Sequence, residues 1–320
     1  MHENILVLGG SGFVGRHVVN KLVDRNHGGS GRVIVPTRRV ARTRHLQLLP
    51  TVEVVEADVL DRGQLGRLVA QSDAVINLVA ILHGSEADFE RVHVGLPKSL
   101  AEACMGNKVR RVIHVSALGA AAEAPSRYQR SKARGEAALR SQSALELTVL
   151  RPSVIFGEED HFLNLFASLQ RVFPIVPLAG ADARFQPVWV EDVAEAIVHC
   201  LDNEGTVGQT YECVGPEVFT LRELVRGAGS WSGNARPVLP LPDSLGRLQA
   251  LAMECLPGKP LMSRDNLDSM RVPNIASGKL PGLRELGIEP AAIPAIARSY
   301  LGGQWPHARY DTYRAAAGRK

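Results

Sequence analysis

The stretch VLGGSGFVGRHVV, residues 7–19, places a glycine-rich turn between an apolar run and an amphipathic segment. Gly9, Gly12 and Gly15 follow the spacing G-x-x-G-x-x-G. In a turn that binds a dinucleotide, one glycine makes the tight turn, one lets the backbone approach the pyrophosphate, and one lets the helix pack closely on the sheet. The phosphates then lie at the positive end of the helix.

A plain glycine-rich turn is the alternative for this motif. An apolar strand before it and a helix after it favour the dinucleotide site instead. We therefore predict that the turn and the first helical residues bind the cofactor, namely Gly9, Gly12, Phe13, Val14, Gly15 and Arg16.

The first 150 residues alternate β-branched apolar runs with amphipathic segments. Six runs are strand candidates, NILVL, RVIVP, VEVVEA, DAVINLV, RRVIHVS and LELTVLRP, with helical patterns between them at 16–24, 61–71, 89–105 and 131–141. Strands without in-out alternation, each followed by a helix, predict a parallel sheet that is covered on both faces. The fold class predicted for 1–150 is therefore α/β, a doubly wound parallel (Rossmann) sheet with its ligand site at the carboxyl ends of the strands.

Prolines interrupt this alternation after Arg151. A helix is still predicted at 190–201, with short strands near Val188 and Tyr211. We predict a smaller C-terminal α+β lobe for substrate or partner over 151–302, with some later segments returning to the first domain, and a flexible tail over 303–320.

Composition excludes several other classes. Aromatic residues are 5% of the 320 residues and the net charge is only +4, which argues against a nucleic-acid-binding protein. No apolar run is long enough for a membrane span, and MHENILVLGG is typical of a first strand and not of a signal peptide. Four scattered cysteines predict a reducing compartment and no metal site, Cys104, Cys200, Cys213 and Cys255. We expect a cytoplasmic protein, at the inner face of the membrane if it associates with one.

Two arginines end the second strand candidate. The segment VIVPTRRVAR contains Arg38 and Arg39 and no acid. An acid at this place binds the ribose hydroxyls of NAD, whereas arginine accommodates the additional phosphate of NADP. A solvated basic loop is the alternative, but the missing acid favours NADP(H) over NAD, and Arg16 adds charge on the same side.

The segment YQRSK, residues 128–132, places Tyr128 and Lys132 four residues apart on one face of a helix. A nearby ammonium group stabilises a phenolate, and we expect Lys132 to lower the pKa of Tyr128 from about 10 toward neutrality. Tyr128 would then be a working acid or base. Such a pair is common on helix surfaces by chance; its position just after the strand candidate RRVIHVS favours the catalytic interpretation.

The glycine spacing and the Y-x-x-x-K pair together resemble the short-chain dehydrogenase/reductase superfamily. The resemblance implies that Lys132 also holds the nicotinamide ribose, that Asp58 lies near the adenine, and that NLVA at 77–80 passes under the cofactor. It implies further cofactor contacts from Asp58, Val59, Leu78, Val79, Ala80, Pro152 and Val154.

The same resemblance implies a third catalytic residue, a serine or threonine just past RRVIHVS. Ala117 stands at that position. Ser116 falls one residue early, where an extended segment points to the opposite side, and Ser126 is another candidate. The catalytic set is therefore predicted to be incomplete.

Four further segments narrow the resemblance: SRYQRSKARGE, LRPSVIFGEEDHFLNLFASL, QPVWVEDVAEAI and YECVGPE. They resemble the atypical short-chain dehydrogenases related to the NADPH-binding accessory subunit of respiratory complex I (alpha subcomplex subunit 9), over roughly Asn4 to Asp265. That branch holds quinone-biosynthesis proteins and a chlorophyll-pathway reductase beside cofactor-holding structural subunits.

Three functions are compatible with this resemblance. The leading expectation is an NADP(H)-dependent oxidoreductase for an apolar or quinone-related carbonyl. A non-catalytic NADPH-binding subunit, peripherally associated with a membrane or membrane complex, is the alternative, and a nucleotide-sugar epimerase or dehydratase is the third.

The remaining candidates have simpler interpretations. Asp160 and Asp192 are predicted to cap helices, and His114 is predicted to be a hydrogen-bonded core residue. The segment 243–256 carries an apolar stripe, Leu245, Leu248, Leu251, Ala252, Cys255 and Leu256. We expect this stripe to pack against the smaller lobe; a lid over an apolar substrate, or a surface for a membrane or partner, is the alternative.

Overall fold

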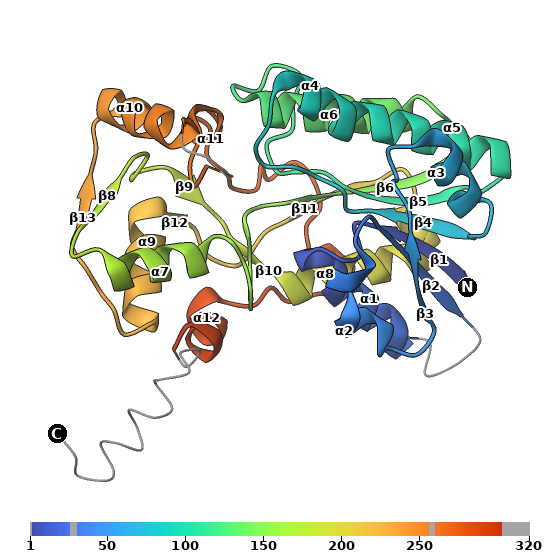
Figure 1. The fold of residues 1–320 in the computed structure, drawn as a ribbon, viewed down its shortest axis with the longest axis horizontal. Helices are drawn as coiled ribbons and strands as arrows, with labels where there is room; N and C mark the ends of the chain where they lie inside the picture. The colour runs from blue at the N-terminus through green and yellow to red at the C-terminus, as the bar shows by residue number, and fades with distance from the viewer. Residues whose placement is uncertain (1, 26–30, 256–259, 303–320) are drawn as a thin grey trace, which may run out of the picture.

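A seven-stranded, fully parallel sheet forms the centre of the larger lobe (Figure 1). The computed structural model describes residues 2–25, 31–255 and 260–302. Across the sheet the strands run β11 (Thr210–Cys213), β6 (Glu146–Pro152), β5 (Arg111–Val115), β4 (Ala74–Asn77), β1 (Asn4–Leu8), β2 (Arg32–Thr37) and β3 (Val52–Glu56). The chain moves from β1 through β2 to β3 and then returns to the other side of β1 with β4. In such a sheet, ligands bind at the strand ends where this reversal occurs.

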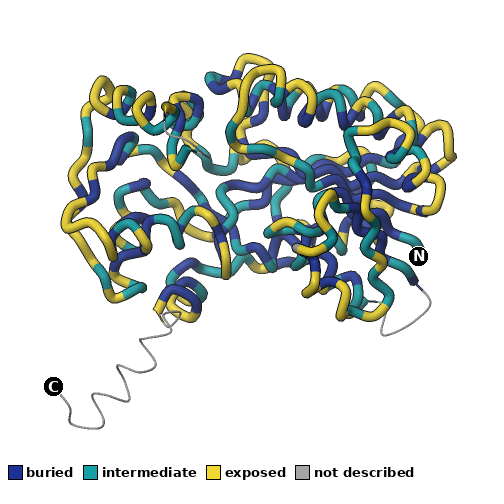
Figure 2. Tube along the Cα trace, in the orientation of Figure 1, coloured by how far each residue is buried: buried dark blue, intermediate teal, exposed yellow. Residues whose placement is uncertain are grey.

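Helices cover both faces of the sheet. One face carries α1 (Phe13–Arg25) and α8 (Val190–Asp202), and the other carries α3 (Arg62–Val69), α5 (Leu96–Asn107) and α6 (Arg127–Arg140). In β1 the side chains of Ile5 and Val7 enter the first of these cores, while Leu6 and Leu8 enter the second. Burial on both faces explains the unbroken apolar runs of the sequence, and Figure 2 shows the sheet as a buried layer. The predicted α/β doubly wound class is confirmed.

Three predicted helices have different bounds in the structure. Helix α1 begins at Phe13, directly after the glycine turn, instead of at 16. The segment predicted as one helix over 89–105 consists of α4 (Glu86–Phe89), the π-helical stretch η2 (Glu90–Gly95) and α5. Helix α6 begins at Arg127 instead of 131, because the Ser126 hydroxyl accepts a hydrogen bond from the Gln129 N–H and caps the helix there.

Within the described ranges, the smaller lobe contains three two-stranded sheets and five helices, with its own apolar core. The strand pairs are β7 (Ile155–Phe156) with β10 (Val188–Trp189), β8 (Val176–Leu178) with β13 (Val238–Pro240), and β9 (Arg184–Phe185) with β12 (Phe219–Thr220). Its helices are α7 (Leu163–Val172), α9 (Leu221–Trp231), α10 (Asp243–Glu254), α11 (Arg264–Ser269) and α12 (Ile293–Leu301). Short elements complete the described chain: α2 (Arg44–Gln47), η1 (Val40–Arg42), η3 (Glu204–Thr206) and η4 (Arg284–Leu286).

The chain crosses between the two lobes more than once. After the first strands of the smaller lobe it returns through α8 and β11 to the central sheet, and then leaves it again. Segments far apart in sequence therefore meet at the carboxyl ends of the strands. The tail predicted over 303–320 lies outside the described residues.

Helix α10 departs from the sequence prediction. It packs through Gly246 and Ala250, which are buried, and a Cβ atom on Gly246 would lie 2.7 Å from the Cβ atom of Ala179. Leu245, Leu248 and Leu251 are instead 52%, 62% and 40% exposed. The expectation that the leucine stripe packs against the smaller lobe is wrong, since the small side chains make the contact; Leu256 lies outside the described residues.

No helix in the described ranges has the length and apolar character to cross a bilayer.

Candidate cofactor and reaction site

The glycine turn lies at the carboxyl end of β1, where the sheet reverses direction. Gly9 has a positive φ of 83°, and a Cβ atom there would lie 3.2 Å from the Leu78 carbonyl carbon. A Cβ atom on Gly15 would lie 2.3 Å from the Gly9 carbonyl oxygen, so helix α1 reaches the turn only because Gly15 has no side chain. The turn is therefore closely packed against its neighbours at the N-terminus of α1. Its glycines leave the backbone accessible, which fits a dinucleotide pyrophosphate.

The next two strand ends supply the predicted adenosine side of the site. Arg38 and Arg39 follow β2 directly and are exposed, and the carboxylates of the described chain form no ion pair with either. Asp58 follows β3, where its carboxylate accepts a hydrogen bond from the Leu60 N–H at 3.1 Å. Val59 is half-buried beside it. Two guanidinium groups thus remain available at the place predicted for the additional phosphate of NADP.

The loop after β4 lies against the glycine turn. Leu78 N–H donates to the Leu8 carbonyl, and the backbone of Leu78 and Val79 contacts Gly9. Ala80 is exposed, whereas Leu78 and Val79 are partly buried. Across the cleft, Pro152 is buried at the end of β6 and Val154 is half-buried. The predicted cofactor residues therefore lie at the carboxyl ends of several strands of the sheet.

Arg16, unlike Arg38 and Arg39, is paired with a carboxylate. Its guanidinium forms an ion pair with Glu159, which follows β7 in the smaller lobe. Glu159 has a φ of +67°, a left-handed conformation that is uncommon for a residue with a side chain. Phe13 approaches the same loop, since its Cζ atom would lie 3.5 Å from a Cβ atom on Gly157. The first turn of α1 thus connects the two lobes at the glycine turn.

Helix α6 presents Tyr128 and Lys132 toward the same end of the sheet. Lys132 is 2% exposed, and its ammonium group donates to the Val115 carbonyl at 2.8 Å. Burial lowers the pKa of Lys132 to about 8, although the Glu136 carboxylate opposes that shift. Glu136 itself forms a buried bidentate pair with Arg151. The lysine is therefore fixed at the end of β5, where the resemblance places a ribose ligand.

The pKa of Tyr128 does not follow the sequence expectation. Burial alone raises it to about 12, and Lys132 does not lower it. Desolvation of the phenol sets the Tyr128 pKa, and burial also lowers the pKa of Lys132 and so weakens its tendency to stay charged. The predicted shift of the Tyr128 pKa toward neutrality is wrong for the protein in this state.

The end of β5 shows how the third catalytic position is occupied. Ala117 is buried and carries no hydroxyl. Ser116 is 4% exposed, and its hydroxyl has no hydrogen-bond partner within the described chain. Ser126 is committed to capping α6. His114, predicted as a hydrogen-bonded core residue, is buried as expected, but only its Nδ1 is bonded, at 3.2 Å from the Asn77 amide.

The two acids predicted to cap helices behave differently. Asp160 is buried and accepts hydrogen bonds from the N–H groups of Phe162 and Asn164 at the start of α7, as a cap does. Asp192 instead accepts from the Ala291 N–H at 2.8 Å, and no side chain caps α8. The cap prediction for Asp192 is wrong: its carboxylate ties the segment before α12 to the larger lobe.

The sequence did not indicate two residues that contact Tyr128. Asp265, on α11, accepts hydrogen bonds from the N–H groups of Arg127 and Tyr128 at 2.7 and 3.1 Å, although it lies 137 residues from Tyr128. His93, on η2, places its ring edge-to-face against Tyr128, with the ring centres 5.4 Å apart. His93 is a polar residue between two valines of a helical pattern, whereas Asp265 lies in the polar segment RDNLDS and gives no sequence signal.

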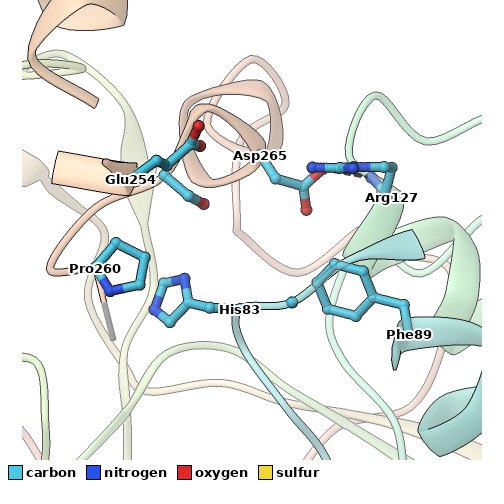
Figure 3. Close-up of a pocket in the computed structure, with 8 residues that line it drawn as sticks. His83, Phe89, Arg127, Glu254, Pro260 and Asp265 are labelled. Atoms are coloured by element: carbon cyan, nitrogen blue, oxygen red, sulfur yellow. Dashed lines mark hydrogen bonds and ion pairs between the residues drawn. The ribbon is translucent and has the colours of Figure 1, made fainter. Parts of the chain in front are cut away.

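A cavity of about 200 Å³ lies between the two lobes beside this helix. Figure 3 shows Phe89 and Arg127 of the larger lobe facing Glu254, Pro260 and Asp265 of the smaller one, with His83 between them. Phe89 also contacts the Tyr128 ring, so the cavity adjoins the reaction site. Both carboxylates are already bonded: Glu254 accepts from Arg264, and Asp265 accepts from the start of α6. Within the described ranges, no cluster of metal-ligating side chains was found.

The family model that matches this chain is that of the NAD dependent epimerase/dehydratase family, and it covers residues 5–213. The chain therefore belongs to this family. The glycine turn, the parallel sheet and the Tyr128–Lys132 pair all lie within the matched part.

Among the curated relatives is the mouse (Mus musculus) mitochondrial NADH dehydrogenase (ubiquinone) 1 alpha subcomplex subunit 9, which is 36% identical over 96% of this chain and 80% of its own. A ceramide reductase of Caulobacter vibrioides is 29% identical over 75% of this chain and 74% of its own. The resemblance drawn from the sequence to the complex I alpha subcomplex subunit 9 is confirmed.

Solved structures share the fold. A double mutant of a dTDP-glucose 4,6-dehydratase from Streptomyces venezuelae, solved with NAD bound, matches with a TM-score of 0.73 at 23% identity. The match covers 96% of this chain and 99% of that one. At this identity the likeness establishes the architecture.

Proposed function

We propose that the protein is an NADP(H)-binding reductase that acts on a carbonyl group, with Tyr128 as the proton donor. The observation that carries the proposal is the placement of Tyr128 and Lys132 on one helix at the end of β5, with the Tyr128 ring in contact with Phe89, which lines a cavity between the lobes. The named ceramide reductase relative supports a reductive activity within this family.

The preference for NADP(H) rests on Arg38 and Arg39. Both are exposed at the end of β2, and no acid occupies the strand end where NAD-binding sheets carry one. A guanidinium group binds a phosphate through paired, charge-assisted hydrogen bonds. Lys132 would hold the nicotinamide ribose, and the backbone at Gly9 and Gly12 would contact the pyrophosphate. When bound, NADPH supplies the hydride.

The protein's own part in the reaction is to hold the carbonyl and deliver a proton. A carbonyl oxygen that gains charge during reduction takes a proton from the Tyr128 hydroxyl. The raised pKa keeps Tyr128 protonated at neutral pH, but it also makes the phenol a weak acid. A cation close to the phenol is then needed to stabilise the phenolate that is left, and Lys132 lies one helical turn away.

The cavity limits the substrate. Its volume of about 200 Å³ is below the ~300–1,000 Å³ typical of pockets that enclose a whole drug-sized ligand, so a compact carbonyl head group fits and any apolar chain would extend outward. A quinone-related or other apolar carbonyl compound with a small reactive ring meets that condition.

A second candidate function is a cofactor-holding subunit without turnover, peripheral to a membrane complex. It is favoured by the alanine at position 117, by the unlowered pKa of Tyr128, and by the identity with the mouse complex I subunit. A nucleotide-sugar epimerase is less favoured, because the hydroxyl expected in such a catalytic set is missing.

Replacing Tyr128 with phenylalanine separates the first two candidates. In a reductase, Tyr128→Phe lowers turnover of a carbonyl or quinone substrate by about 10²–10⁴-fold and leaves NADPH affinity within about twofold. Tyr211→Phe, which removes a buried phenol from β11, is the matched control and leaves turnover unchanged. If the wild-type protein binds NADPH but oxidises it with no member of a carbonyl and quinone panel, the subunit function replaces the reductase.

A further inference from the structure

The π-helical stretch η2 brings a buried histidine against the helix that carries Tyr128. π-helical turns are rare and occur frequently at functional sites. Here Gly135 of α6 makes the contact possible, because a Cβ atom on it would lie 2.1 Å from the His93 carbonyl oxygen. The Arg134–Glu90 ion pair at 2.7 Å closes the same contact at the surface. The two helices are therefore held at a fixed and very short separation at His93.

Both ring nitrogens of His93 are hydrogen-bonded. Its side chain is 2% exposed, and Nε2 accepts from the Ile81 N–H at 3.0 Å. A neutral imidazole that accepts at Nε2 carries its proton on Nδ1, which lies 2.8 Å from the Ser131 hydroxyl oxygen. The Ser131 hydroxyl in turn donates to the Tyr128 carbonyl at 2.7 Å. An unbroken series of hydrogen bonds thus joins the loop after β4 to the backbone of Tyr128.

The ring of His93 also fixes the ring of Tyr128. The two ring planes meet at 80° with their centres 5.4 Å apart, and Phe89 makes a similar contact at 6.2 Å and 68°. Such edge-to-face contacts are favourable by about 0.5–1.5 kcal/mol each. These two aromatic edges therefore restrain the ring of Tyr128.

We propose that His93 is a positioning residue for Tyr128, which couples the orientation of the phenol to the loop that carries the predicted cofactor residues Leu78, Val79 and Ala80. The proposed function supplies the reason for orienting Tyr128; the contacts themselves are independent of it. Burial, aided by the charge of Lys132, lowers the pKa of His93 to about 3, so the ring stays neutral and is no proton donor at neutral pH.

Two substitutions separate the ring contact of His93 with Tyr128 from its hydrogen bonds. His93→Phe keeps an aromatic edge against Tyr128 and loses both hydrogen bonds. His93→Gln loses the ring and retains an acceptor for the Ile81 N–H. His114→Gln is the matched control, since His114 is equally buried at 2% exposure but makes no ring contact with Tyr128 in the described structure.

The full chain would be labelled with 3-fluorotyrosine, and Tyr128→Phe would assign the Tyr128 fluorine resonance. In His93→Gln that resonance shifts and sharpens because the ring gains freedom, while in His93→Phe it stays near the wild-type position. In His93→Phe the Ile81 amide exchanges with solvent at least about fivefold faster, and NADPH affinity falls by a similar factor, as expected for one lost hydrogen bond. The His114→Gln control changes neither readout.

An unchanged Tyr128 resonance in His93→Gln, together with unchanged Ile81 exchange in His93→Phe, would overturn the proposal. Should His93→Phe fail to fold, the resonance in His93→Gln decides alone. Neither the resonance nor amide exchange requires turnover or bound cofactor. A wild-type protein that fails to bind NADPH would therefore remove the proposed function and leave the test of His93 intact.

Discussion

The two halves of the cleft differ in how many of the groups expected for their function are present. The cofactor half comprises the glycine turn, Arg38 and Arg39, and there the backbone is close-packed and both guanidinium groups remain available. The reaction half comprises Ala117, Tyr128 and Lys132, and there one hydroxyl is missing and the phenol pKa is raised to about 12. The difference teaches that this chain is built more completely to hold a dinucleotide than to transfer a proton.

The largest expected effect concerns the cofactor half. Gly15→Ala drives a Cβ atom into the Gly9 carbonyl and the Gly10 backbone, which have no room to move, so we expect a loss of about 3 kcal/mol in the free energy of unfolding and loss of NADPH binding. Gly66→Ala on helix α3 is the control, because a Cβ atom there would meet nothing within 4 Å. Urea unfolding and fluorescence titration measure both. Equal effects of the two changes would show that the glycine turn is less tightly packed than described.

The second effect tests the burial of Lys132 in the reaction half. Its pKa of about 8 in the folded protein lies below the ordinary 10.5, so between these values the unfolded chain binds more protons and stability rises with pH. Lys132→Met removes the cost of the buried charge. The variant should therefore exceed the wild type by roughly 3 kcal/mol below pH 8, and the gap should narrow toward pH 10.5.

Urea unfolding at several pH values measures this gap. Lys21→Met is the control, because Lys21 lies at the surface beside Glu191 and Glu195. A gap between the wild type and Lys132→Met that does not change with pH would contradict the depressed pKa of Lys132.

The third effect concerns the choice of cofactor. Arg38→Ala removes one charge-assisted contact to the additional phosphate of NADPH, so we expect NADPH affinity to fall about 30-fold, or roughly 2 kcal/mol, with NADH affinity nearly unchanged. Arg44→Ala, on the nearby helix α2, controls for the general loss of positive charge. Parallel titrations with both cofactors decide, and equal losses for the two would refute NADP preference.

The smallest expected effect is a gain in turnover when the hydroxyl missing from the reaction half is restored. Ala117→Ser places a hydroxyl at the end of β5 where a complete catalytic set has one, and a hydrogen bond to the reacting oxygen would raise turnover about tenfold, or roughly 1.4 kcal/mol. Ala120→Ser, at another buried alanine in the same loop, is the control. If Ala117→Ser turns over no faster than the wild type, the missing hydroxyl does not limit this half of the cleft.

The cofactor half was predictable because its signals are local. Gly9, Gly12 and Gly15 lie within one strand–turn–helix unit, and unbroken apolar runs reveal strands buried on both faces. Right-handed connections between parallel strands then place helices on both faces when the chain reverses its direction across the sheet. The residues predicted to bind the cofactor do lie at the carboxyl ends of the strands. Their binding role stays a prediction.

The reaction half depends on contacts that no spacing in the sequence reveals. Asp265 reaches Tyr128 across 137 residues, and the π-helical turn that aims His93 looks like an ordinary helix in the sequence pattern. The same limit explains the error at α10. Two small residues, Gly246 and Ala250, make the contact there, while the pattern gives weight only to the large leucines on the other side.

The contact between Asp265 and helix α6 also sets an order for the protein's synthesis. Strands β1 to β6 and helix α6 all leave the ribosome before residue 265 is translated, and most of the sheet can assemble by then. At the N-terminus of α6 two backbone N–H groups have only water as acceptor until the carboxylate of Asp265 is present. The nascent chain can therefore form its glycine turn early. Tyr128 reaches its final position only near the end of translation.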